Sequence, residues 1–165
     1  MEVCDAGGGT VDLISYEVDS VNPFLISECS IGTAGQCGSL FLDKAFEEAI
    51  RARLGEWAER VLKPRTLAEM MRYFNRFLKV EFKDDEGVPF VNFAVPGAPD
   101  IPEAGIEGGF MTMSRYPPAG SLGNSREELR GIFLPTFQKV LELINGQIEQ
   151  VNNKFGPGSL NVSPE

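Results

Sequence analysis

Residues 5–12 read Asp-Ala-Gly-Gly-Gly-Thr-Val-Asp, and this stretch predicts the fold of the first part of the chain. Val3, Cys4 and residues 11–18, on either side of the glycines, are rich in β-branched side chains, which predicts two strands joined by a tight turn. Glycines tolerate positive φ and carry no Cβ, so their backbone amides can gather around an anion. A Walker A loop and a GxGxxG loop both open a helix and are therefore different motifs. The pattern predicts a strand, a phosphate-binding turn and a second strand.

A hairpin turn without a ligand is the simpler interpretation of the same glycines. The two flanking carboxylates, Asp5 and Asp12, favour a ligand. Carboxylates repel a bound phosphate unless a divalent cation or a water lies between them. We therefore expect Mg²⁺ together with a nucleotide, whose phosphates are held by Gly7, Gly8, Gly9 and Thr10.

This motif and two later stretches are similar to one protein superfamily. Residues 5–12 resemble the second phosphate motif of the actin, sugar-kinase and heat shock protein 70 superfamily, and the continuation to Val18 resembles its heat-shock-70-like branch. Residues 32–35 and 37–43 resemble the loop and helix start that approach the nucleotide there. Residues 125–129 resemble the long helix that returns the chain to the nucleotide-binding core.

The resemblance implies an α/β fold, locally α+β: part of an actin-like, ribonuclease H-like ATPase domain, with a phosphate-binding β-hairpin followed by a mostly helical lobe and a small sheet. It implies ATP or ADP and Mg²⁺ as ligands. Asp5 would position Mg²⁺ or the attacking water, and Asp12 would support that arrangement, so both are candidate catalytic residues. Further residues of the loop, the helix start and a later helix would lie near the nucleotide: Gly35, Gly38, Ser39, Asn75, Arg76 and Lys79.

The resemblance covers only the middle of the family's domain. A first phosphate hairpin and a Gly-Gly adenosine motif belong to the complete domain, and this sequence matches neither. We expect one truncated domain, in which residues 1–36 form the hairpin portion, 37–124 form the helical and β lobe, and 125–165 form the returning helix. Three origins stay open: another chain supplies the missing half, the chain was cut from a longer one, or the half was lost in evolution.

Composition excludes several classes of protein. The 165 residues, 42% of them hydrophobic, suit one globular domain. A formal net charge of −9 argues against non-specific binding to nucleic acid, which relies on lysine and arginine. Because no apolar run approaches the ~20 residues of a membrane span and the start has no secretory pattern, we expect no membrane partner and a cytoplasmic setting. The absence of histidine removes His-based catalysis, and three cysteines without CxxC spacing support neither a zinc site nor a disulfide framework.

Two helices are expected in the middle of the chain. Apolar residues at three- and four-residue steps predict one over residues 41–54, with Ser39 as a possible N-cap and Gly55 as its end. Residues 66–69 (Thr-Leu-Ala-Glu) have the capping-box pattern and predict the start of a second helix.

Two strands and a long helical region are expected after that. Residues 88–95 and 110–113 predict paired strands. A second capping box, Ser125 to Glu128, predicts the start of a long helical region that Pro135 should interrupt.

Three functions compete at this point. The first is the ATP-binding portion of a heat-shock-70-like chaperone ATPase, weak or inactive alone because several groups that stabilise a phosphoryl-transfer transition state are missing. The second is a non-catalytic module that binds other proteins, such as clients. The third is a fragment of a sugar-kinase-like phosphotransferase.

Overall fold

The computed structural model describes residues 1–82, 90–114 and 128–159. They form a mixed α+β structure with two small antiparallel sheets. The chain divides into two compact units, which are described separately: unit 1 comprises residues 1–41 and 136–165, and unit 2 comprises residues 42–135. Within the described ranges, no helix is both long and apolar enough to cross a membrane.

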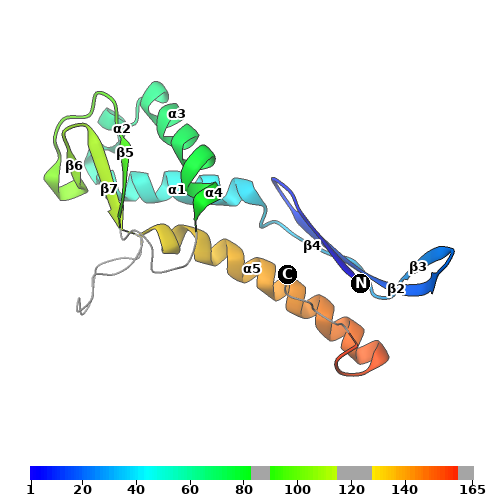
Figure 1. Ribbon diagram of the computed structural model, residues 1–165. Coiled ribbons are helices and arrows are strands. Elements are labelled where there is room, and N and C mark those ends of the chain that lie inside the picture. The colour runs from blue at the N-terminus through cyan, green and yellow to red at the C-terminus, as the bar shows by residue number, and fades with distance from the viewer. Residues whose placement is uncertain (83–89, 115–127, 160–165) are drawn as a thin grey trace. The chain divides into compact units, whose positions relative to one another are not determined.

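Unit 1 contains the first sheet, in which β2 pairs antiparallel with each of the other three strands (Figure 1). The strands are β1 (Glu2–Ala6), β2 (Val11–Val21), β3 (Phe24–Glu28) and β4 (Thr33–Gly35). The strand–turn–strand expectation for the first residues is confirmed. Burial alternates along β2, where Val11, Leu13 and Ser15 are buried and Asp12 is exposed.

Helix α5 (Glu128–Phe155) supplies the other part of unit 1. Its residue Gln147 is completely buried, donates a hydrogen bond to Ser30 Oγ at 2.7 Å and accepts one from Thr33 Oγ1 at 3.3 Å. Lys154 Nζ donates to the Cys29 carbonyl oxygen at 3.0 Å. These polar contacts fix the helix against the strands that follow the turn.

Unit 2 packs short helical segments against the second sheet, whose strand order is β5-β7-β6. Its strands are β5 (Phe90–Ala94), β6 (Ile106–Glu107) and β7 (Phe110–Ser114). Helix α1 (Ser39–Leu54) begins in unit 1 and continues into unit 2. The shorter helical segments are η1 (Gly55–Trp57), α2 (Ala58–Val61), α3 (Pro64–Tyr73), η2 (Phe74–Leu78), α4 (Lys79–Glu81) and η3 (Pro102–Ala104). The core is aromatic: the Phe46 and Phe74 rings stack with centroids 4.2 Å apart, and Phe82 stacks on Phe133 at 3.9 Å. These rings belong to the buried apolar cluster of unit 2 or pack against it.

The helix expected over residues 41–54 is confirmed, and Gly55 ends it with a φ of +52°. The prediction that a helix starts with a capping box at Thr66 is wrong. Helix α3 already begins at Pro64, because proline suits the first helical turn, where no N–H partner is needed. The Thr66 hydroxyl instead donates a hydrogen bond to the Pro96 carbonyl oxygen at 3.2 Å.

The interruption expected at Pro135 is also wrong, because α5 runs through it as one helix of 28 residues. A proline inside a helix loses one backbone hydrogen bond. Buried side chains on either side, Phe133 and Thr136, compensate by packing. Ser125, where the second capping box was expected, lies outside the described residues. Residues 88 and 89, at the start of one expected strand, also lie outside them, and the described part of that strand is β5. The pairing of this strand with residues 110–113 is confirmed, because β5 pairs with β7.

Candidate phosphate-binding turn

The turn between β1 and β2 is a short exposed loop. The paired strands bring Asp5 opposite Asp12, and the Gly7 N–H donates to the Thr10 carbonyl oxygen at 2.9 Å, which closes the turn. Every side chain from Asp5 to Thr10 is exposed. The turn therefore presents its backbone to solvent at the end of a hairpin.

The carbonyl groups of this turn face the start of α1. Gly7 O accepts from the Ser39 N–H at 3.1 Å, and Gly8 O accepts from the Leu40 N–H at 2.8 Å. Gly9 O accepts from the Gly38 N–H at 3.3 Å. The first N–H groups of a helix have no partner within the helix, so the turn satisfies them as a cap made of backbone.

The same contacts determine where the amides of the turn point. In a trans peptide the C=O and the following N–H lie in one plane and point in opposite directions, and none of these peptides is cis. The N–H groups of Gly8, Gly9 and Thr10 therefore point away from α1. Within the part of the chain that the structure describes, none of the three donates a hydrogen bond. Three adjacent free amides on an exposed turn form a site where an anion can bind.

The fold itself does not require glycine at positions 8 and 9. A Cβ built on Gly8 would have Leu40 Cγ at 3.9 Å as its nearest neighbour, and one on Gly9 would have nothing within 4 Å. Neither residue, nor Gly7, adopts a left-handed φ. Since neither space nor φ demands glycine here, the missing side chains leave bare backbone that a ligand can approach.

Asp5 and Asp12 lie directly opposite each other, so their side chains project from the same face of the hairpin. Thr10 Oγ1 donates to Asp12 Oδ2 at 2.9 Å and orients that carboxylate. Among the described residues neither aspartate has a lysine or arginine partner. Like charges in this position repel, and a divalent cation between them would remove the repulsion.

The described ranges contain no cluster of three or more acidic, cysteine or histidine side chains able to hold a metal. Mg²⁺ is usually held by one or two carboxylates, with waters and substrate phosphates completing its octahedron. The aspartate pair fits that use, and it does not fit a metal cage made entirely of protein ligands.

The structure brings Gly38 and Ser39 to the turn, on its carbonyl side. A Cβ on Gly38 would lie 2.5 Å from the Gly8 carbonyl oxygen, so this close approach requires glycine. Gly35 is explained by a different contact, because a Cβ there would lie 2.6 Å from Leu143 Cδ1 of α5. Packing alone accounts for both of these glycines.

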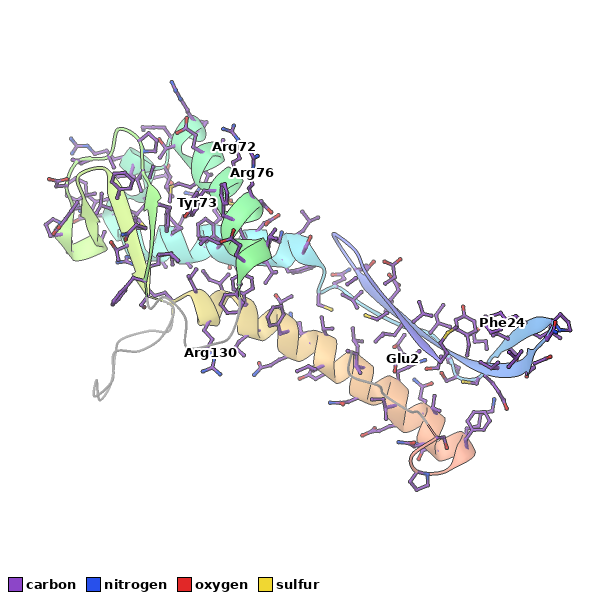
Figure 2. All side chains as sticks on the ribbon, viewed as in Figure 1. Glu2, Phe24, Arg72, Tyr73, Arg76 and Arg130 are labelled. Atoms are coloured by element: carbon purple, nitrogen blue, oxygen red, sulfur yellow. The ribbon has the colours of Figure 1, made fainter. Side chains whose placement is uncertain are left out.

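Three polar residues expected near the nucleotide, Asn75, Arg76 and Lys79, lie in unit 2, on η2 and at the start of α4. Figure 2 labels Arg76. Lys79 Nζ contacts Asp43 Oδ1 at 2.7 Å, with both side chains largely buried, and Asn75 Oδ1 at 3.0 Å. The Arg76 guanidinium lies 5.8 Å from the centre of the Phe77 ring. Lys79 and Asn75 therefore have structural roles within their own unit.

The pKa values of two titratable groups on β1 are shifted from their ordinary values. Burial raises the pKa of Glu2, and the N-terminal ammonium lowers it by less. Burial also raises the pKa of the Cys4 thiol, with the carboxylates of Glu2 and Asp5 adding to the effect. A raised pKa lowers the fraction of thiolate, and so the reactivity of Cys4, at neutral pH.

Sequence reasoning found the turn but missed its contact with α1. The capping hydrogen bonds join residues 7–9 to residues 38–40, and no local pattern reports such a distant pairing. The prediction of Ser39 as the N-cap is wrong, because α1 already begins at Ser39 and the residue before it is Gly38, which has no side chain to cap the helix.

No protein-family model matches the chain, and no curated protein matches it.

Proposed function

We propose that the turn of residues 7–10 binds the phosphates of a Mg²⁺-nucleotide, ATP or ADP. The observation that carries the proposal is the set of three free amides, on Gly8, Gly9 and Thr10, that the capping of α1 turns outward. Phosphate binding by consecutive backbone amides is an established use of such turns. The ATP-binding portion of a heat-shock-70-like ATPase with an actin-like fold is the function that this turn and its aspartates support best.

Each residue of the turn has a distinct part in this proposal. The amides hold phosphate oxygens, and Asp5 holds Mg²⁺, directly or through a water. Asp12, oriented by Thr10 Oγ1, supports the metal or the attacking water. Mg²⁺ bound there neutralises phosphate charge and orients the terminal phosphate, which is what phosphoryl transfer requires of the protein.

Affinity and turnover of this chain alone should be low. The turn supplies contacts to phosphates, and Lys79 and Asn75, two of the residues expected at the base, are engaged elsewhere. We expect a Kd for Mg·ATP of roughly 0.1–1 mM, about 4–5.5 kcal/mol of binding free energy. Chaperone activity, clients and a cytoplasmic setting are part of the same proposal.

Calorimetric titration of ATP, with and without Mg²⁺, tests the site. Gly8→Val adds a branched side chain between two of the three amides, with its Cβ 3.9 Å from the nearest atom, Leu40 Cγ, and it should abolish binding. Gly146→Val is the matched control, because a Cβ at Gly146 of α5 also meets nothing within 4 Å and lies away from the turn. Binding by the parent and the control but not by Gly8→Val supports the proposal. Equal binding by all three proteins contradicts it.

A further inference from the structure

The ribbon formed by β2 and β3 has two chemically different faces. Residues directly opposite each other in an antiparallel pair project from the same face. Three pairs project from one face, namely Tyr16 with Glu28, Val18 with Ile26 and Val21 with Phe24, and two project from the other, namely Glu17 with Ser27 and Ser20 with Leu25. We call the residues Val18, Val21, Phe24 and Ile26 the apolar face of the ribbon.

The apolar face is open to solvent. Its side chains are between 40% exposed, for Ile26, and 81% exposed, for Val21. Figure 2 shows Phe24, which is 61% exposed, on this ribbon. Beyond β3, no strand of the described residues pairs with its outer edge. An exposed apolar edge strand of this kind is a template for a further strand.

The opposite face is acidic. The register shift of the β2–β3 pair leaves Asp19 as the extra residue, and Ser27 Oγ donates to Asp19 Oδ1 at 3.2 Å, which places that carboxylate beside Glu17. We call Glu17 and Asp19 the acidic face. Neither forms an ion pair with any described residue. Residues 1–41 contain no lysine or arginine, and Lys154 of α5 donates to the Cys29 carbonyl oxygen and forms no ion pair with either acid.

We propose that the outer edge of β3 receives an extended polypeptide segment of another protein, in which apolar residues alternate with lysine or arginine. Side chains of an added strand alternate between the two faces of the sheet. Its apolar residues therefore continue the apolar face, and its basic residues meet the acidic face. Backbone hydrogen bonds to the free edge supply affinity, and the two faces supply specificity. This inference is independent of the nucleotide proposal.

Charge decides against a second copy of this chain as the occupant. Two copies paired through β3 would bring Glu17 and Asp19 of each onto one face, without a cation between them. Juxtaposed like charges oppose association, most strongly at low salt. The complementary partner is basic.

Fluorescence anisotropy with a short labelled peptide of alternating valine and lysine tests the proposal on the whole chain. We expect saturable binding that weakens as salt is added. Three control peptides separate the contributions: glutamate in place of lysine, the same composition without alternation, and N-methylation of alternate backbone amides. Each control peptide should bind at least about tenfold more weakly. The first removes charge complementarity, the second removes the match to the two faces, and the third removes backbone pairing.

Variants of the chain locate the surface. Phe24→Ser and the pair Glu17→Gln with Asp19→Asn should each weaken the alternating peptide about tenfold or more, and only the second should flatten the salt dependence. Ile31→Ser is the control, because Ile31 is 80% exposed but lies outside the ribbon, and it should bind like the parent. Equal binding of the N-methylated or non-alternating peptide would overturn the proposal. So would equal effects of Phe24→Ser and Ile31→Ser, or a low-salt dimer of the parent that Phe24→Ser dissociates.

Discussion

The two units differ in where they place their aromatic and aliphatic side chains. Unit 2 buries most of its large apolar side chains in one cluster, in which Phe46 and Phe74 are completely buried and stacked on each other, and it exposes Phe77, Val80, Phe90 and Phe110. In unit 1 the strands β2 and β3 expose Phe24 and Val21 to solvent. Burial of apolar side chains stabilises a fold, whereas an exposed apolar strip marks a surface that another molecule covers. Unit 2 therefore contains the larger apolar core, and the strip on β2 and β3 makes unit 1 the place where we propose that a partner binds.

The largest expected effect separates these two uses of phenylalanine. Phe74→Ala should lower the free energy of unfolding by about 3–5 kcal/mol, because it empties a packed core position. Phe24→Ala should change it by no more than about 0.5 kcal/mol, since that ring is already 61% exposed. Urea unfolding followed by circular dichroism measures both, and the fluorescence of Trp57, the only tryptophan, follows unit 2 in the same titration. Similar losses for the two variants would contradict the contrast between the units.

The next effect concerns the contact that joins the turn to α1. Gly38→Ala should lower the free energy of unfolding by about 1–3 kcal/mol, because its Cβ would lie 2.5 Å from the Gly8 carbonyl oxygen and force the turn away. Gly9→Ala is the control within the same contact, because its Cβ meets no atom within 4 Å. Thermal unfolding by circular dichroism compares them. A melting temperature of Gly38→Ala equal to that of Gly9→Ala would show that the turn does not cap α1.

Removing the charge of Asp5 should change the metal dependence of nucleotide binding. Asp5→Asn keeps the size of the side chain, so Mg·ATP should bind roughly tenfold more weakly, about 1.4 kcal/mol, while ATP without metal binds equally or better. Calorimetry in the presence of Mg²⁺ and of a chelator measures both affinities. Asp100→Asn, an aspartate of unit 2, is the control for the loss of one charge. If both aspartate variants respond alike, Asp5 does not hold the metal.

The smallest effect is a pH dependence in unit 1. Burial raises the pKa of Glu2, so the folded chain holds this proton more tightly than the unfolded chain does. Protonated Glu2 contributes its full stability below the ordinary pKa of glutamate. This contribution is lost as the pH rises through the raised pKa of Glu2 in the folded chain. Glu2→Gln should therefore raise the melting temperature slightly at pH 7 and leave it unchanged near pH 4. A lower melting temperature of Glu2→Gln at pH 7 would reverse the sign and disprove this account of burial.

Local patterns predicted the elements whose cause is local. β-branched residues around the glycines gave the first hairpin, apolar spacing gave α1, and alternation gave the pair β5 and β7. Thr66 and Pro64 each suit a helix start, α3 begins at Pro64, and the Thr66 hydroxyl donates to the Pro96 carbonyl oxygen from inside the helix. The continuation of α5 through Pro135 likewise depends on packing that no local signal reports.

Only the local part of the candidate site could likewise be predicted from the sequence. Asp5, Asp12 and the glycines between them could be chosen from the sequence, because a phosphate turn is a local motif. The direction of its amides could not, since it follows from hydrogen bonds to Ser39 and Leu40 far along the chain. The expected roles of Asn75 and Lys79 came from resemblance alone, and their contacts within unit 2 give them another use.

The central claim is that the N–H groups of Gly8, Gly9 and Thr10 are free and bind phosphate. Amide proton and nitrogen shifts of the ¹⁵N-labelled chain, recorded while ADP and Mg²⁺ are added, test it directly. The account predicts large downfield shifts of these three amide protons, with smaller changes at Ser39 and Leu40, whose N–H groups already donate to the turn. Unchanged shifts at the three amides at millimolar ADP, or larger changes at Ser39 and Leu40, would contradict it.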